Sequence, residues 1–408
     1  MPLDIEMFYY FFSIFIGYLI GSISPGYFFG KFLKKIDIRE YGYHNTGAKN
    51  TFLMVGTIPG LATGIFDFFK GLLTIGIVYN FLNVPLYIVY LSGFSAILGH
   101  IFPFYLRFRG GVGIATAVGM LSFSLVRALQ NQWIPWLTIL VPLLAGFLFF
   151  FITKDKVSAK TIPYLVILFA LFSFIYLTAP LNTTTIFLGL LLIFLFVKNA
   201  CFLREDPKFF EIINKAKTIK DITSWRNFFR PFAILFPILY LYFDKKLILI
   251  FTGSLSAIFI LIDLFRFGFK KANVFLFKKL FIKKKEITVF SSLSFFMLAC
   301  FISFLVFEKS IAIIAVVFLI FGDLFSKIFG LLFGQRKFFQ QTWEGAMASL
   351  TACLIFGYLF IHFLNFPFLI LFAGALSASI IEALPIGIDD NFTVALISGA
   401  IMYLMIIL

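Results

Sequence analysis

The chain has 408 residues, of which 61% are hydrophobic and only 13% are charged. In an ordinary soluble globular protein, about a quarter of the residues are charged. The composition of this chain therefore excludes that class of protein and predicts a polytopic membrane protein. Lysine and arginine outnumber aspartate and glutamate by 34 to 19. Because the basic residues lie between apolar segments, we assign them to membrane-surface loops and anionic membrane lipids, with no nucleic acid as partner.

Apolar segments long enough to cross a bilayer recur along the whole chain and predict an all-α fold with about fourteen spans, seven in each half. In the first half, the predicted spans are 8–30, 60–82, 85–106, 112–128, 134–152, 161–178 and 183–200. In the second half, they are 231–243, 247–265, 287–307, 310–322, 346–365, 367–384 and 392–408. The division predicts a membrane domain over 1–200, an interfacial linker over 201–230 and a second membrane domain over 231–408.

The charge of the loops predicts the orientation. Basic residues cluster after the first, third and fifth spans, whereas the opposite loops of the first half hold only Arg127. By the positive-inside rule, the N-terminus is then outside and the basic loops are cytoplasmic. We therefore expect a multi-pass protein of the cell inner membrane with its active sites facing the cytoplasm.

The first polar cluster of the chain contains Ser22, Arg39 and a loop of amides and glycines with Asn45 and Asn50. Hydroxyls, amides, glycines and an arginine suit phosphate oxygens better than they suit a metal ion. The cluster therefore predicts a site for a phosphate-bearing substrate.

The second cluster places Asp67 and Lys70 inside an apolar span. Ionisable residues are costly there, so they indicate either a function or mutual pairing. A structural ion pair between residues one helical turn apart is the alternative to a functional site.

The third cluster runs from Gly99 to Ala117. It contains His100, Arg107, Arg109, Gly110, Gly111 and Gly113. Glycines let backbone N–H groups close around a phosphate, and the arginines supply the opposite charge. The alternative is that the glycines let helices pack closely and that His100 packs at a helix end.

In order and spacing, these clusters resemble the motifs of the bacterial acyl-phosphate:glycerol-3-phosphate acyltransferases, a family with seven spans. The resemblance covers residues 8 to about 205. It implies transfer of a fatty acyl group from acyl phosphate to glycerol 3-phosphate, which gives lysophosphatidate and needs no cofactor. The residues that it assigns to catalysis are Ser22, Arg39 and His100. Those that it assigns to substrate binding are Asn45, Asn50, Lys70, Arg109, Gly110, Gly111 and Gly113.

The chain departs from that family at the lysine of its Gly-Gly-Lys-Gly motif, which is Val112 here. Loss of a lysine that neutralises phosphate weakens transition-state stabilisation unless another cation takes its place. Arg107, Arg109 and Lys49 are the candidates for this replacement.

In the second half, acidic residues stand near the ends of apolar spans. They are Asp323, Glu344, Glu382, Asp389 and Asp390. Oxygen ligands of this kind suit magnesium bridging a polyphosphate. A helix cap is the alternative for Asp323 alone, whereas the adjacent Asp389 and Asp390 repel each other unless a cation joins them.

This half resembles the family of dolichol kinase, phytol kinase and the CTP-dependent diacylglycerol kinase, most closely in the run from Glu382 to Asn391. The resemblance implies that a lipid alcohol, diacylglycerol or polyprenol, is phosphorylated from CTP with Mg²⁺. It assigns catalysis to Asp323, Glu344 and Asp389, and substrate binding to Asn391. It assigns the metal to Asp323, Glu382, Asp389 and Asp390. A lysine of the family is replaced by Gln341.

The sequence thus predicts a bifunctional enzyme of phospholipid biosynthesis, with acyl phosphate, glycerol 3-phosphate and a lipid alcohol as its small-molecule partners. The alternative is a divergent, partly inactive enzyme that acts as a transporter or scaffold for lipid or phosphate. The sequence contains no signal for the oligomeric state.

Overall fold

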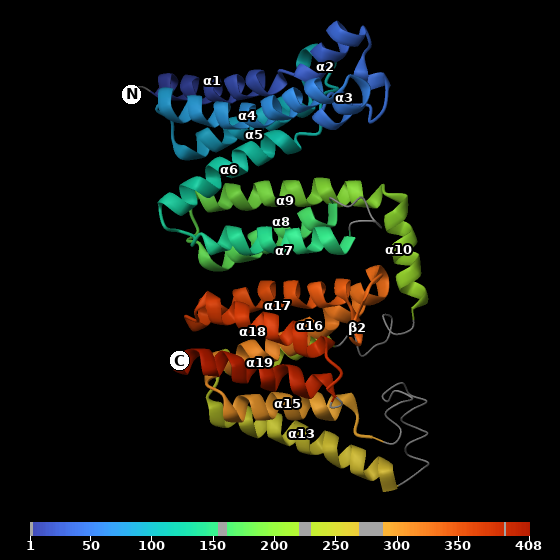
Figure 1. Ribbon diagram of the computed structural model, residues 1–408. Helices are drawn as coiled ribbons and strands as arrows, with labels where there is room; N and C mark the ends of the chain where they lie inside the picture. Colours follow the sequence, from blue (N-terminus) through green and yellow to red (C-terminus); the bar gives the residue numbers. More distant parts are fainter. Residues whose placement is uncertain (1–2, 154–160, 220–229, 269–288, 387–388) are drawn as a thin grey trace. The chain divides into compact units, whose positions relative to one another are not determined.

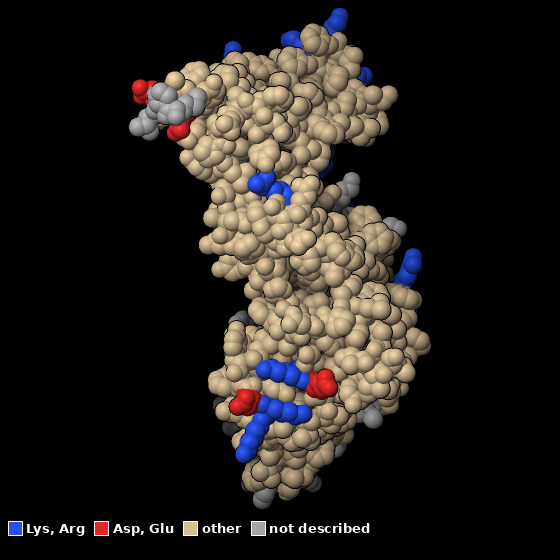
Figure 2. Space-filling view, turned by 90° about the vertical axis from the view of Figure 1, so that its left-hand side faces the viewer, with Lys and Arg blue, Asp and Glu red and all other residues tan. Residues whose placement is uncertain are grey.

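The computed structural model describes residues 3–153, 161–219, 230–268, 289–386 and 389–408 (Figure 1). Within these residues, nine helices are long and apolar enough to cross a membrane, and five shorter apolar helices accompany them. Each predicted span falls on one of these helices, so the all-α polytopic prediction is confirmed. The face shown in Figure 2 carries few charged side chains, as expected of helices that lie against lipid.

The chain forms two compact units, the first comprising residues 1–138 and 171–199. Its helices are α1 (Leu3–Ser22), α2 (Pro25–Phe29), α3 (Ala48–Met54), α4 (Thr57–Phe81), α5 (Leu86–Ile101), α6 (Ile114–Gln130), the second half of α8 (Thr161–Thr178) and most of α9 (Thr183–Arg204). Short helical turns in its connections are η1 (Gly30–Lys34), η2 (Ile38–Glu40) and η3 (Phe104–Leu106).

In the first unit, α1, α4 and α5 run side by side, and glycines let the backbones of α1 and α5 approach closely (Figure 1). A Cβ at Gly21 of α1 would overlap the backbone of Ala96 in α5, and one at Gly99 would overlap the backbone of Tyr18. Small residues are the usual means of close helix packing in membranes. The packing brings the segment after α1 and the segment after α5 to the same end of the unit.

The second unit comprises residues 139–170 and 200–408. Its elements are α7 (Leu137–Thr153), the first half of α8 (Thr161–Thr178), α10 (Pro207–Thr218), η4 (Arg230–Ile234), α12 (Leu235–Tyr242), α13 (Lys245–Gly268), α15 (Ser292–Val306), α16 (Lys309–Phe333), α17 (Trp343–Leu364), α18 (Phe368–Ala383) and α19 (Asp390–Ile407). A two-residue antiparallel hairpin, β1 (Lys337–Phe338) and β2 (Gln341–Thr342), connects α16 to α17. The buried helix α16 is packed against α15, α17, α18 and α19.

Residues 139–170 group with the second unit, which differs from the predicted first domain of 1–200. The physical reason is an apolar core in which Phe149 and Ile152 of α7 pack with Leu203, Leu332 and Phe333. Hydropathy finds the spans, but it does not say which neighbours they bury against.

The predicted linker over 201–230 contains one amphipathic helix, α10. Asp206 caps it by accepting a hydrogen bond from the Lys208 N–H, and Phe209 and Ile212 pack against the core of the second unit. Lys215 donates to the carbonyl of Leu332 at the end of α16, 3.4 Å away. Residues 220–229 of the predicted linker lie outside the described residues.

The span predicted over 310–322 is too short. Helix α16 continues to Phe333, so Asp323 lies inside the helix and is not at its end. The helix continues because apolar residues resume at Leu324 and because Lys327, one turn later, pairs with Asp323 at 2.7 Å. The alternative of a helix cap at Asp323 is therefore wrong.

A buried polar network joins α13 to α15. The Asp263 carboxylate accepts hydrogen bonds from Arg266 (3.1 Å), the Ser291 N–H (2.8 Å) and the Ser294 hydroxyl (2.6 Å). Arg266 also donates to the carbonyl of Val289, 2.6 Å away. Asp263 and Arg266 have almost no exposed surface, so their ion pair is buried.

We expect Asp263→Asn to destabilise the second unit by about 3–5 kcal/mol, because it breaks a buried ion pair and the carboxylate that accepts from Arg266, Ser291 and Ser294. Thermal unfolding of the purified protein in detergent would measure the loss. Glu308→Gln is the control, since Glu308 is exposed and its side chain does not cap α16. Equal melting temperatures for the two variants would contradict this account.

Candidate functional site

Two loops of the first unit meet at one end of its helices. One contains residues 37–50 and the other contains residues 102–113; together they are called the two-loop site. The Thr46 N–H donates to the carbonyl of Gly110 (3.2 Å). The Arg39 guanidinium donates to the carbonyls of Leu106 (2.6 Å) and Arg109 (3.3 Å). The sequence clusters around Arg39 and Gly110 are thus brought together.

Arg39 is held in place by Asp37. The Asp37 carboxylate accepts the Arg39 backbone N–H, which starts η2, and it also accepts side-chain bonds from Nε (2.9 Å) and NH2 (2.6 Å). Hydrogen bonding to Arg39 holds the pKa of Asp37 below its ordinary value, and the same bonds raise the pKa of Arg39. Asp37 balances the charge of Arg39, and the hydrogen bonds of the Arg39 guanidinium connect the two loops.

The predicted amides shape the first loop. Asn50 is fully buried, and its amide donates to the carbonyls of Ile38 and Asn45, both at 2.7 Å. Its oxygen accepts the Tyr43 N–H (2.8 Å), and the Asn45 oxygen accepts the Gly47 N–H (3.0 Å). These amide groups therefore order the backbone of the loop.

Ser22 lies at the end of α1, where it is 1% exposed and donates to the carbonyl of Tyr18 (2.8 Å). The Tyr105 hydroxyl donates to the carbonyl of Ser22 (3.0 Å) and accepts the Ser24 N–H (3.2 Å). Tyr105 thereby ties the second loop to the end of α1. Sequence reasoning missed Tyr105, because one tyrosine in a chain with 20% aromatic residues carries no signal.

The glycine segment continues from the end of α5. The N–H groups of Gly110 and Gly111 donate to the carbonyls of Ile101 (3.0 Å) and His100 (2.9 Å), which need donors because they end the helix. A Cβ at Gly111 would overlap the imidazole of His100. These contacts favour the close-packing alternative for the two glycines, and phosphate binding by Gly110 and Gly111 stays a prediction. Gly113, at φ +86°, starts α6 without a side-chain cap.

Asp67, Lys70 and His100 form a buried network below the two-loop site. Lys70 lies 2.8 Å from the Asp67 carboxylate and donates to the carbonyl of Ile23 (3.0 Å). The Thr116 hydroxyl donates to the carbonyl of Asp67 (2.9 Å), so His100 Nδ1, 2.7 Å from the same hydroxyl, carries a hydrogen and donates to it. The structural alternative of an ion pair therefore holds for Asp67 and Lys70.

Three cations of the two-loop site are exposed. Arg109 lies 3.6 Å from Glu40 with 61% of its side chain exposed, and Lys49 lies 4.2 Å from the ring of Tyr43. Arg107 and the following Phe108 both have positive φ, at 54° and 58°. Such a conformation is strained in residues other than glycine, and strain of this kind often marks a functional loop.

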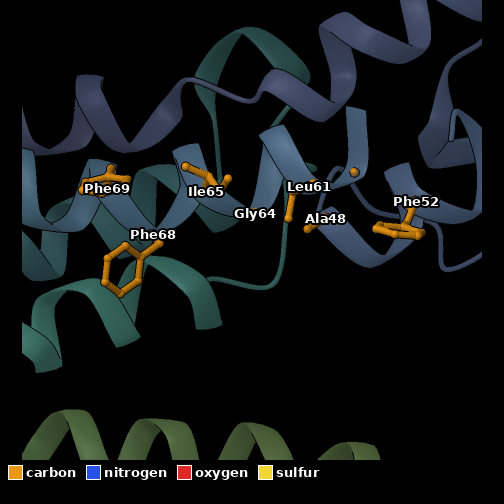
Figure 3. Close-up of a pocket in the computed structure, with 8 residues that line it drawn as sticks. Ala48, Phe52, Leu61, Gly64, Ile65, Phe68 and Phe69 are labelled. Carbon is orange, nitrogen blue, oxygen red and sulfur yellow. The ribbon is translucent and has the colours of Figure 1, made fainter. Parts of the chain in front are cut away.

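An apolar pocket of about 380 Å³ lies beside the two-loop site (Figure 3). Its lining begins at Ala48, the first residue of α3, which lies within the first loop of the site. The lining residues from α3 and α4 are Ala48, Phe52, Gly60, Leu61, Gly64, Ile65, Phe68 and Phe69. A pocket with this lining suits a hydrocarbon chain.

The second unit has a separate charged cluster around Asp323, which is 4% exposed. Asp323 pairs with Arg230 of η4 and with Lys327 of α16. Arg230 also donates to the Asn391 side-chain oxygen (2.5 Å), and Asp389 caps α19 by accepting the Asn391 N–H (3.0 Å). Sequence reasoning missed Arg230 and Lys327, because their partners are set by the packing.

Glu382 lies in the same cluster and is 1% exposed. Its Oε2 accepts the Ser349 hydroxyl (2.7 Å), whereas its Oε1 is buried without a hydrogen-bond partner. Gln340 donates to the carbonyl of Glu382 (3.0 Å) and to Asp390 (3.1 Å), and Gln341 donates to the carbonyl of Glu382 (2.9 Å). The hairpin that carries both glutamines thus covers the cluster.

Glu344, also predicted to be catalytic, accepts the N–H of Gln335 (3.1 Å) at the base of the hairpin. Within the part of the chain that the structure describes, no group of three or more His, Cys, Asp or Glu residues is arranged to hold a metal ion. Asp323 and Glu382 therefore share a cluster without forming a ready-made metal site.

We expect Gly111→Ala to destabilise the first unit by about 1–3 kcal/mol, because the added methyl group would displace the imidazole of His100. Gly76→Ala is the matched control, since a Cβ at this position of α4 meets nothing within 4 Å. The control should be neutral or slightly stabilising, by up to about 1 kcal/mol. Thermal unfolding of both variants tests the assignment, and an equally stable Gly111→Ala would refute it.

Comparisons with known proteins concern the half of the chain that contains the two-loop site. The family model "Glycerol-3-phosphate acyltransferase" matches residues 11–204. A protein of that name from Prochlorococcus marinus (strain MIT 9301) is 38% identical over 164 residues, which are 40% of this chain and 77% of that protein. One from Prochlorococcus marinus (strain MIT 9312) is 44% identical over 107 residues, which are 26% of this chain and 54% of the relative.

The chain thus spans about half the length of some curated relatives and about three quarters of others. Among solved structures, the chain is similar to one described as PlsY (YgiH), an integral membrane glycerol 3-phosphate acyltransferase, in its glycerol 3-phosphate form. That similarity has a TM-score of 0.35 and 26% identity, and it covers 48% of this chain and 92% of the other.

Proposed function

Because the chain belongs to the glycerol-3-phosphate acyltransferase family through residues 11–204, we propose that its first half transfers a fatty acyl group from acyl phosphate to glycerol 3-phosphate. The observation that carries the proposal is the two-loop site. Its two loops are connected by the hydrogen bonds of Arg39, and exposed cations lie on both loops. Loop charge further supports placing this site on the cytoplasmic side of the inner membrane.

The reaction needs no covalent enzyme intermediate, because acyl phosphate is already activated. The 1-hydroxyl oxygen of glycerol 3-phosphate forms a bond to the acyl carbon, and the bond from that carbon to the phosphate oxygen breaks. The departing phosphate accepts the hydroxyl proton, so the products are lysophosphatidate and inorganic phosphate. The protein then contributes chiefly orientation and positive charge.

The exposed cations are the groups best placed to contact phosphate oxygens. Arg107, Arg109 and Lys49 surround the loops, whereas the charge of Arg39 is balanced by Asp37. The first turn of α6, which has no side-chain cap, adds backbone N–H donors of the kind that bind anions. These groups take over the role of the lysine that Val112 replaces.

The apolar pocket between α3 and α4 supports the same proposal. It begins one residue after Gly47 of the two-loop site, so a ligand can have its polar end at the loops and a hydrocarbon chain in the pocket. We assign the pocket to the acyl chain of the donor.

The test uses the full chain in detergent with palmitoyl phosphate and labelled glycerol 3-phosphate, and we expect labelled lysophosphatidate to form. Arg39→Lys should lower the rate about 10- to 100-fold, because an ammonium cannot replace charge-assisted bonds worth about 1.5–3 kcal/mol. Lys31→Gln, an exposed residue of η1, is the control and should leave the rate unchanged. If the unchanged chain forms no product, or if Arg39→Lys retains full activity, the proposal fails.

For the second unit, we propose phosphorylation of a lipid alcohol, diacylglycerol or polyprenol, with CTP as donor. The lipid hydroxyl would attack the terminal phosphorus, the bond to the bridging oxygen would break, and CDP would leave. The observation in favour is Glu382, whose buried Oε1 has no hydrogen-bond partner and is placed to accept the hydroxyl proton. Arg230 and Lys327 supply positive charge in the same cluster.

Magnesium does not fit this cluster as it is arranged. Both carboxylate oxygens of Asp323 contact Lys327 or Arg230, and the described residues contain no set of three candidate ligands. Magnesium binding therefore stays a prediction from the resemblance.

The kinase proposal is tested with CTP labelled in its terminal phosphate and with diacylglycerol or a polyprenol in mixed micelles. We expect a labelled lipid phosphate, and we expect Glu382→Gln to abolish it because the amide cannot take up the proton. Acyl transfer by the first half should persist in this variant, and an unchanged melting temperature would show that the second unit, which contains Glu382, is folded. A Glu382→Gln variant with undiminished kinase activity would contradict the role of Glu382, and the absence of product in both assays would favour the scaffold or transporter.

A further inference from the structure

The first unit contains a second polar cluster, at the opposite end of its helices from the two-loop site. It is formed by Tyr79 of α4, Tyr90 of α5, Ser124 and Arg127 of α6, and Thr184 of α9. Gly113 starts α6 beside the two-loop site, and Arg127 follows fourteen residues later, about 20 Å along the helix. Nothing in the acyl transfer described above uses this cluster.

Three buried polar atoms of this cluster have no partner within hydrogen-bond distance. The Tyr90 hydroxyl, the Thr184 hydroxyl and Arg127 Nε are buried and have no hydrogen-bond partner. Tyr90 and Thr184 have no exposed surface, and the Tyr90 hydroxyl lies beside the side chains of Thr184 and Ser124. Ser124 directs its own proton to the carbonyl of Met120 (3.0 Å). Buried polar groups are normally paired, so this set of two hydroxyls and one guanidinium nitrogen indicates a missing partner.

The cluster also carries an unbalanced positive charge. Arg127 donates to the Tyr79 hydroxyl (3.1 Å) and lies 5.4 Å from the centre of its ring, but it pairs with none of the described carboxylates. Arg127 stands in the last turn of α6, near the predicted loop. Water would satisfy the donors, but only an anion would also balance the charge.

We propose that this cluster binds a phosphate group, whose oxygens accept hydrogen bonds from the Tyr90 hydroxyl, the Thr184 hydroxyl and Arg127 Nε. Thr184 lies in the first turn of α9, so the positive end of that helix also faces the anion. A phospholipid headgroup and free phosphate both present this chemistry. The bound anion connects α5, α6 and α9, and it reaches α4 through Arg127 and Tyr79.

The test compares the full chain with Tyr90→Phe and Arg127→Gln. Tyr90→Phe removes one hydroxyl and keeps the ring that stacks on Phe187, with centroids 5.1 Å apart. Lys31→Gln, which removes an exposed cation from the other end of the first unit, is the matched control. One arm measures retention of added phosphatidylglycerol by native mass spectrometry, with diacylglycerol as the probe that lacks phosphate. The other arm measures binding of labelled inorganic phosphate by equilibrium dialysis.

The two-loop site also takes phosphate in the proposed reaction, so we expect at least two components in the binding curve of the unchanged chain and of Lys31→Gln. Both cluster variants should lose at least tenfold in the affinity of one component and keep the others. Binding of phosphatidylglycerol but not of diacylglycerol identifies a headgroup, whereas binding of inorganic phosphate alone identifies the free ion. Without ligand, Tyr90→Phe should unfold at the same temperature as the unchanged chain or higher, because it removes an unpaired buried hydroxyl. Retained affinity in both cluster variants, or no binding of any phosphate-bearing probe, would overturn the proposal.

Discussion

The ion pair between Asp67 and Lys70 is the interaction on which the first unit depends. Two charges inside an apolar helix are stable only when each has a partner, and the pair draws its other partners from neighbouring segments. Lys70 holds the carbonyl of Ile23 after α1, and the backbone of Asp67 holds Thr116 at the start of α6. His100 of α5 completes the network through Thr116. One pair thus positions the helix ends that carry both loops of the site.

In the two-loop site, the buried residues hold the loops in shape, whereas the exposed residues are accessible to a substrate. Asn50 and His100 are buried and direct their polar atoms to protein groups, so they hold the loops in shape. Arg109 and Lys49 are exposed, so a phosphate can approach them at little desolvation cost. Arg39 stands between the two classes, because its guanidinium joins the loops and is balanced by Asp37. A substitution at Arg39 therefore acts on the geometry of the site more than on its net charge.

The sequence predicts the spans well because hydropathy and length determine which segments cross a bilayer. It predicts partners poorly, because these depend on contacts between segments far apart in the chain. Spacing alone gave no way to tell that the N–H groups of Gly110 and Gly111 complete the end of α5. The contact of Arg230 with Asp323 joins positions more than ninety residues apart, and no local pattern encodes it. The Asp67 and Lys70 pair was open to prediction, since both residues lie on one helix.

Helices of both units contain an ion pair between an acidic and a basic residue one turn apart. The groups around each pair determine whether all of its polar atoms have partners. Asp67 with Lys70 and Asp263 with Arg266 are closed networks, because backbone and hydroxyl groups supply their further partners. Asp323 with Lys327 is different: the lysine side chain is 39% exposed, and the neighbouring Glu382 keeps a buried oxygen without a partner. A network in which every polar atom has a partner is not stabilised further by a ligand. A network with an unpaired polar atom is stabilised by a ligand that supplies the missing hydrogen bond. The Asp323 pair is therefore the one of the three whose surroundings favour a ligand.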